Sequence, residues 1–187
     1  MPTDEQKTVL GFAVELYFDA DTENAIRAFR DELYAAGVTP VLGKMGDRPH
    51  VSLAVFAEAD VSCVKDLTQN LASDLSPFEV ELSAIGTFPT TDNVLFLYPV
   101  PSERLLKVHR DFHEQLICSF IRSSAYYHPG NWVPHCTVEF ELEDKVFEKA
   151  IKAAHQLFHP IRGTFQSIGF VSFRPIEYIS EFQLKRG

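Results

Sequence analysis

The sequence predicts a two-lobed domain of mixed strands and helices, formed by duplication of one unit within a single chain. Two observations support this prediction: a short histidine-containing motif occurs twice, and the same order of elements surrounds both copies. A unit of this length that occurs only twice is typical of a two-lobed domain rather than a solenoid. Two equivalent lobes would place equivalent strands on opposite sides of a central groove.

The first half of the chain begins with an apolar strand, which is followed by a helix with one apolar stripe. The stripe consists of Ile26, Phe29, Leu33 and Ala36, and Gly37 is typical of a helix end. The predicted elements are strand 12–18, helix 23–36, the first motif strand, helix 61–75 and strand 78–88.

The second half repeats this order of elements. Its first helix has an apolar stripe of Leu105, Val108, Phe112 and Leu116, and Ser102 is a candidate N-cap. The predicted elements are strand 94–98, helix 102–120, the second motif strand, helix 144–158 and strand 161–173. The matching order indicates that one unit is present twice in the chain.

The repeated motif places a histidine after a proline and two residues before a hydroxyl side chain. The first motif is Pro49-His50-Val51-Ser52 and the second is Pro134-His135-Cys136-Thr137. On a strand, residues i and i+2 project from the same face, so each motif offers an imidazole beside a hydroxyl. Two such pairs facing each other across the groove supply the proton transfers and the oxyanion hydrogen bonds of phosphodiester chemistry. The alternating side chains are expected on the back face: Val51, Leu53, Val55, Cys136, Val138 and Phe140.

The composition bounds the class of protein. The 187 residues are enough for one compact domain, 45% of them are hydrophobic, and no apolar run is long enough to span a bilayer. The net charge of −9 argues against an extended nucleic-acid footprint, although a nucleotide or an RNA end needs only a few local cations. Three scattered cysteines without metal-ligand spacing, and a polar segment 1–7 without a signal-peptide pattern, favour a reduced, cytoplasmic setting.

Residues near the motifs are candidate substrate contacts. Lys44 and Arg48 precede the first motif and could neutralise a phosphate, or could be solvated loop charges. Tyr127 and Trp132 precede the second motif and could stack on a base, or could pack their loop against the sheet. Glu139 is expected on the same face as the second histidine. A carboxylate there could raise the pKa of an imidazole, and we expect it at the solvated rim of the groove.

With these motifs the chain resembles the 2H phosphoesterase superfamily, and more closely its bacterial branch named the 2′-5′ RNA ligase family. The segment from Trp132 to Thr137 is especially similar to the second motif of that branch. The resemblance implies a bilobal α+β fold with two antiparallel sheets lining a central groove and helices on the outside. It implies one domain over residues 1–187, with lobes of roughly 8–90 and 91–181 that could exchange strands.

The resemblance also implies hydrolysis, or the reverse ligation, at a 2′,3′-cyclic or 2′-5′ phosphodiester, with no metal or other cofactor. His50 and His135 would form the acid–base pair. Ser52 and Thr137 would hold the phosphate oxygens. The sequence leaves open which histidine is the base, what the physiological substrate is and how the chain oligomerises.

Three alternatives use the same residues. The protein could trim RNA 3′ ends or act on 2′-5′ linkages with the same site, or it could bind nucleotides or RNA ends without catalysis. A third hypothesis is a metal site made by His50, His135 and Glu139, since catalytic zinc normally takes three protein ligands. The hydroxyls two residues after each histidine would have no role in such a site. Insensitivity of activity to a chelator would separate the first two hypotheses from the third.

Overall fold

The computed structural model describes residues 11–185, so the polar segment 1–7 lies outside the described residues. The described chain contains four α-helices and seven strands, with two short 3-10 helices, η1 and η2. No helix within it is long and apolar enough to cross a membrane. In chain order the elements are β1 (Gly11–Phe18), α1 (Ala20–Ala35), η1 (Leu42–Met45), β2 (His50–Phe56), α2 (Val61–Asp74), β3 (Phe78–Thr87), β4 (Leu95–Pro99), α3 (Glu103–Cys118), η2 (Ala125–Tyr127), β5 (Cys136–Glu139), α4 (Asp144–Leu157), β6 (Ile161–Phe173) and β7 (Glu177–Gln183).

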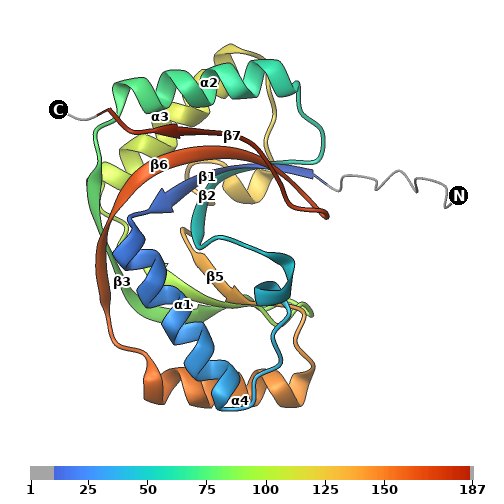
Figure 1. Ribbon diagram of the computed structural model, residues 1–187. Helices are drawn as coiled ribbons and strands as arrows, with labels where there is room; N and C mark the ends of the chain where they lie inside the picture. Colours follow the sequence, from blue (N-terminus) through green and yellow to red (C-terminus); the bar gives the residue numbers. More distant parts are fainter. Residues whose placement is uncertain (1–10, 186–187) are drawn as a thin grey trace, which may run out of the picture.

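All seven strands belong to one antiparallel sheet, and the fold is α+β. The strand order is β2-β1-β6-β3-β4-β5, with β7 paired to β6. Residues 165–173 of β6 pair with β1, whereas residues 161–165 pair with β3. The resemblance implies two antiparallel sheets, and the structure joins them into one, because the 13 residues of β6 run through both halves as the long arc of Figure 1. A strand of this length can join two halves because different parts of it pair with different neighbours.

The helices cover the sheet in two pairs at opposite ends of the molecule. Helices α1 and α4 lie at one end and α2 and α3 at the other (Figure 1). Helix α1 begins where the Asp19 carboxylate accepts a hydrogen bond from the backbone N–H of Thr22 at 2.9 Å. Ile26, Phe29 and Leu33 of its apolar stripe are buried as the periodicity predicts, and Ala36 is half-buried. The predicted N-cap of α3 is confirmed, since the Ser102 hydroxyl accepts from the backbone N–H of Leu105 at 3.2 Å.

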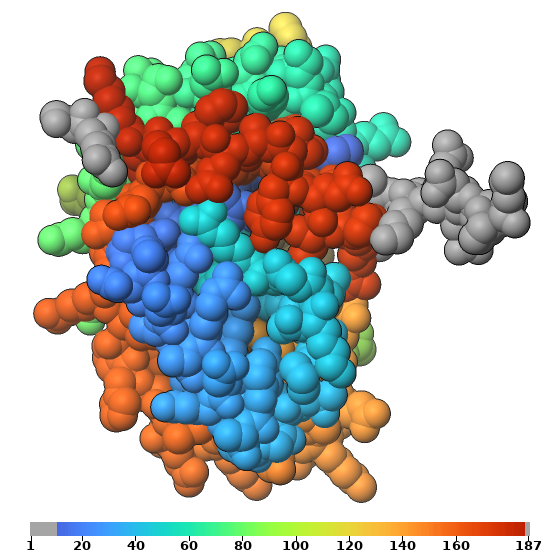
Figure 2. All heavy atoms as spheres, in the orientation of Figure 1, coloured from blue at the N-terminus to red at the C-terminus, as the bar shows by residue number. Residues whose placement is uncertain are grey.

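Strand β7 is the element that the sequence pattern does not predict. It lies along β6 from residue 177 to residue 183, and most of its side chains remain partly or fully exposed. Polar residues interrupt its apolar ones, so the segment lacks the apolar run that marks the buried strands. The start of β7 approaches the segment that precedes β2, where the hydroxyl of Tyr178 lies 3.5 Å from the carbonyl oxygen of Gly46. Figure 2 shows these two segments, red and cyan, in contact on the face that it draws.

Candidate active site

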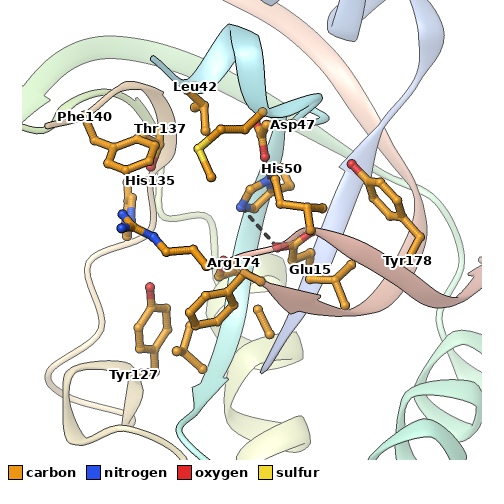
Figure 3. Close-up of a pocket in the computed structure, with 17 residues that line it drawn as sticks. Glu15, Leu42, Asp47, His50, Tyr127, His135, Thr137, Phe140, Arg174 and Tyr178 are labelled. Atoms are coloured by element: carbon orange, nitrogen blue, oxygen red, sulfur yellow. Dashed lines mark ion pairs between the residues drawn. The ribbon is translucent and has the colours of Figure 1, made fainter. Parts of the chain in front are cut away.

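The two motifs meet because the sheet curls until its outer strands lie side by side. Strands β2 and β5 stand at opposite ends of the strand order, yet they contact each other. Between them lies a pocket of about 340 Å³, a size typical of small-molecule sites. The four motif side chains with histidine or hydroxyl groups all line it: His50, Ser52, His135 and Thr137 (Figure 3).

Each motif strand has a β-bulge directly after its hydroxyl residue. In β2, Ser52 pairs with Glu15 and Ala54 with Val14, which leaves Leu53 as the extra residue. In β5 the extra residue occupies the equivalent place, between the pairs that β5 forms with Phe96 and Leu95 of β4. A bulge reverses the alternation of side chains beyond it. The two halves of the chain therefore share a local backbone irregularity as well as a motif.

The bulges correct the face predicted for two apolar residues. Val55 and Phe140 are expected on the back face, but both line the pocket. Each lies three residues after the hydroxyl of its motif, so one extra residue has turned it inward. The two side chains form apolar walls beside the polar groups of the motifs.

The bulge in β5 also overturns the prediction for Glu139, which is fully buried and does not line the pocket. Its carboxylate accepts hydrogen bonds from the backbone N–H groups of Val41 at 3.1 Å and Leu42 at 2.9 Å, and from the hydroxyl of Tyr34. A carboxylate at this position fixes the loop that leads to η1. Leu42 and Met45 of η1 in turn form part of the pocket wall.

His50 lies between two carboxylates. Its Nε2 is 3.3 Å from Oε1 of Glu15, and its Nδ1 is 3.4 Å from Oδ1 of Asp47 (Figure 3). Nδ1–H also donates to the carbonyl oxygen of Arg48 at 2.8 Å. Burial alone would lower the pKa of His50, but the charges of Glu15 and then Asp47 outweigh it and raise the pKa to about 10. His50 is therefore an imidazolium at neutral pH.

His135 has the same backbone contact but different surroundings. Its Nδ1–H donates to the carbonyl oxygen of Val133 at 2.8 Å, so Nε2 is left as the free nitrogen. The edge of the imidazole meets the ring of Phe88, with the ring centres 4.9 Å apart. Burial, together with the nearby positive charge of His50, holds the pKa of His135 below its usual value. His135 is therefore neutral at neutral pH, and the pocket contains one charged and one neutral imidazole.

Two buried contacts connect the motifs to each other. Arg30 of α1 donates from one guanidinium nitrogen to the Asp47 carboxylate at 3.1 Å and to the backbone carbonyl of Thr137 at 2.7 Å. The indole N–H of Trp132 donates to the backbone carbonyl of Ser52 at 3.1 Å. Each contact runs from the neighbourhood of one motif to the backbone of the other. Together they fix the separation of the two histidines.

Of the four candidate substrate contacts, only Tyr127 lines the pocket. Trp132 instead stacks on His109, with ring centres 3.9 Å apart and planes within 2°. Arg48 is held by ion pairs to Glu23 and to Glu181, the latter at 2.9 Å. Lys44 belongs to η1 and does not line the pocket. The position of Trp132 therefore agrees with the alternative of loop packing, and the positions of Lys44 and Arg48 agree with the alternative of loop charges.

Sequence reasoning misses four polar residues that line the pocket: Glu15, Asp47, Arg174 and Tyr178. Glu15 carries a signal, since it is a charged residue within the otherwise apolar strand 12–18. Its contact with His50 nevertheless depends on how β1 and β2 pair, which the sequence does not reveal. Arg174 and Tyr178 follow the last predicted strand and give no local pattern.

The arrangement of possible ligand side chains does not favour the hypothesis of a metal site made by His50, His135 and Glu139. Within residues 11–185, no three histidine, cysteine or carboxylate side chains are grouped as metal ligands. Glu139, which that hypothesis requires, is turned away from the histidines and holds the loop before η1. The two carboxylates that do reach His50 form ion pairs with it instead.

Comparisons with known proteins agree with this site. The sequence profile described as the 2′-5′ RNA ligase superfamily matches residues 18–175. A protein of Geobacillus kaustophilus with the provisional name phosphoesterase is 23% identical over 133 residues, which are 62% of this chain and 73% of that protein.

Solved structures share the fold. The crystal structure of Escherichia coli LigT complexed with 3′-AMP has a TM-score of 0.64 at 16% identity, and the match covers 96% of this chain and 100% of that one. A second crystal structure, described as a phosphoesterase, has a TM-score of 0.65 at 16% identity with the same coverage of both chains. At these identities the likeness establishes a common fold.

Proposed function

The chain belongs to the 2′-5′ RNA ligase superfamily of 2H phosphoesterases, and from this premise we propose that it is a metal-independent phosphodiesterase. Its substrate is a 2′,3′-cyclic phosphate or a 2′-5′ phosphodiester of a nucleotide or an RNA end. The observation that carries the proposal is the presence, in one pocket, of two histidines, of which His50 lies between two carboxylates and His135 does not. General acid–base hydrolysis needs one group that accepts a proton and one that donates it.

The different surroundings of the two histidines support opposite roles for them. Neutral His135 accepts a proton on Nε2 from the attacking water, because its Nδ1 already donates to a backbone carbonyl. Charged His50 donates its Nε2 proton to the departing ribose oxygen, while Glu15 and Asp47 stabilise the imidazolium beforehand. Each transfer contributes roughly a hundred- to ten-thousand-fold in rate. The sequence leaves this assignment open because the two motifs are nearly identical.

The hydroxyls of Ser52 and Thr137 donate to the non-bridging phosphate oxygens as negative charge develops on them. Both line the same pocket as the histidines, and their strands are held by the contacts from Trp132 and Arg30. Fixed donors avoid reorganisation during the reaction and are therefore more effective than water.

Three further observations support a small nucleotide or an RNA end as the substrate. The pocket of about 340 Å³ suits a nucleotide, and the net charge of −9 opposes a long nucleic-acid footprint. The related fold of Escherichia coli LigT was crystallised with 3′-AMP. Trimming of RNA 3′ ends and ligation are alternatives that would use the same four side chains. In ligation, the reverse reaction, the histidines would exchange roles.

Hydrolysis in the presence of a chelator tests the proposal. The substrates are nucleoside 2′,3′-cyclic monophosphates, 2′-5′ linked dinucleotides and short RNAs, with wild type, His50→Gln and His135→Gln compared. The exposed His155 of α4 provides a matched control as His155→Gln. We expect wild type and the control to hydrolyse at least one substrate class, and each motif variant to lose at least about a hundredfold. Near-wild-type turnover by either motif variant would exclude the two-histidine mechanism.

A further inference from the structure

An anionic substrate needs more positive charge than the motifs supply. Two carboxylates line the pocket, those of Glu15 and Asp47, and the charge of His50 offsets one of them. Arg30 pairs with Asp47 from the buried side of the pocket. With these charges balanced, a phosphate still requires a cation of its own.

Arg174 is the single arginine or lysine among the described residues that line the pocket. It lies in the turn between β6 and β7, and in Figure 3 its side chain extends across the pocket toward the side where Phe140 and Thr137 lie. The guanidinium carbon is 5.4 Å from the ring centre of Phe140, the residue that the β5 bulge turns inward. Arg174 therefore extends over the wall formed by the second motif strand.

The present partner of Arg174 is a weak one. Its guanidinium pairs with Glu141, and the two side chains are 42% and 44% exposed. Exposed ion pairs are worth roughly 0–1 kcal/mol, because water competes for both charges. A phosphate in the pocket offers a guanidinium two parallel charge-assisted hydrogen bonds, which are stronger. Exchange of the Glu141 carboxylate for a phosphate therefore costs little.

Both partners of this ion pair have an unusual backbone conformation. Arg174 has φ +55° and Glu141 has φ +54°, in the left-handed region that side chains other than glycine rarely adopt. Such a residue costs roughly 1–2 kcal/mol. Residues held in this way concentrate at ligand clamps, where the surrounding structure maintains them. Here two of them, from segments far apart in the sequence, meet at the mouth of one pocket.

From this geometry we infer that Arg174 is a substrate-binding residue, whose guanidinium leaves Glu141 and binds a phosphate oxygen of the nucleotide. The inference rests on the proposed function, and it assigns the role that the sequence suggested for Lys44 and Arg48. The phosphate is either the reacting one or a 5′-phosphate on the same nucleotide. In both cases Glu141 competes with the substrate, so its charge weakens binding.

Binding measurements with two probes test this inference without requiring turnover. The probes are a nucleoside 3′-monophosphate and the corresponding nucleoside 3′,5′-bisphosphate, titrated calorimetrically into wild type and variants. Arg174→Met removes the cation, and Glu141→Gln removes its competitor. Arg162→Met is the matched control, because Arg162 also lies on the β6 side, is 82% exposed and pairs with a glutamate, Glu81, at 3.0 Å, but does not line the pocket.

We expect Arg174→Met to weaken binding by about 10- to 100-fold, since a hydrogen bond to a charged group contributes about 1.5–3 kcal/mol. Glu141→Gln should strengthen binding, and Arg162→Met should leave it within about twofold of wild type. A loss for both probes identifies the phosphate at the histidines as the ligand. A loss for the bisphosphate alone identifies the 5′-phosphate.

Three results would overturn the inference: no binding of either probe to wild type, equal affinities of Arg174→Met and the control, or weaker binding by Glu141→Gln. The last result would show that the ion pair itself supports the pocket. Parallel turnover of the 2′,3′-cyclic nucleotide separates this inference from the proposed function. Binding that depends on Arg174 without turnover by wild type would contradict the phosphodiesterase proposal and leave the role of Arg174 intact.

Discussion

Replacement of Glu15 by glutamine tests whether His50 is an acid that its neighbours keep charged. Oε1 of Glu15 lies 3.3 Å from Nε2 of His50, and both side chains are largely buried. At an effective dielectric constant of about 20, unit charges at this separation interact by about 5 kcal/mol. One pKa unit corresponds to about 1.4 kcal/mol, so Glu15→Gln should lower the pKa of His50 from about 10 by roughly three to four units.

The assay is kcat/KM for cyclic-nucleotide hydrolysis from about pH 5 to about pH 11, because this ratio reports the pKa values of the free enzyme. Wild-type activity should rise as His135 loses its proton, below the usual histidine pKa, and should fall near pH 10 as His50 loses its own. The activity of the variant should fall between about pH 6 and about pH 7. At about pH 8.5 it should keep roughly one-thirtieth of wild-type activity or less, and at about pH 6 it should lie within about threefold.

The control is Glu81→Gln, which removes a surface carboxylate paired with Arg162. It should leave both limbs of the profile in place. An alkaline limb that stays near pH 10 in Glu15→Gln, with a uniformly lower plateau, would show that Glu15 acts only through structure and would refute the electrostatic reasoning.

Three further predictions concern buried charges. Arg30→Met should lower the free energy of unfolding in urea by about 3–5 kcal/mol, because Asp47 loses its buried partner. The double variant with Asp47→Asn should recover part of this loss. Strictly additive losses from the two substitutions would contradict the pairing. Burial holds the pKa of His109 near 4, so the unfolded state takes up the proton first as the pH falls. His109 should therefore cost about 3 kcal/mol of stability between about pH 6.5 and about pH 4. His109→Gln should remove this part of the drop and leave the part that comes from His113, whose pKa burial also lowers; an unchanged slope would exclude His109 as a source. Glu139→Gln should speed amide hydrogen exchange at residues 41–42 by roughly tenfold or more, because their N–H groups donate to the Glu139 carboxylate. Unchanged exchange rates at these residues would contradict the role of Glu139 in fixing the loop before η1.

The sequence predicts the four motif side chains because its evidence for them is local. The i, i+2 spacing sets the face that His50 and Ser52 share, and the repeated order of elements predicts where the second pair belongs. The amphipathic helices and the N-cap of α3 follow from equally local patterns. For these features, short-range rules are sufficient.

The remaining features depend on how distant segments pair. One extra residue in β5 turns Phe140 into the pocket and Glu139 to the opposite, buried face, and nothing in the tetrapeptide marks a bulge. Glu15 reaches His50 only because of the register between β1 and β2. Arg174 enters the pocket from a turn far along the chain, whereas Arg48, adjacent to the motif in sequence, is neutralised by Glu23 and Glu181. Proximity in sequence is therefore a poor guide to the cation of this pocket.

The central claim is that His50 is the acid and His135 the base, and the dependence of each variant on the leaving group tests it most directly. A 4-nitrophenyl phosphodiester of a nucleotide needs no proton on its leaving group, whereas a 2′,3′-cyclic phosphate does. His50→Gln should therefore lose about a hundredfold or more on the cyclic nucleotide but less than about tenfold on the nitrophenyl ester, and His135→Gln should lose similar activity on both. Equal losses by His50→Gln on the two substrates, or the selective loss appearing in His135→Gln, would contradict the account.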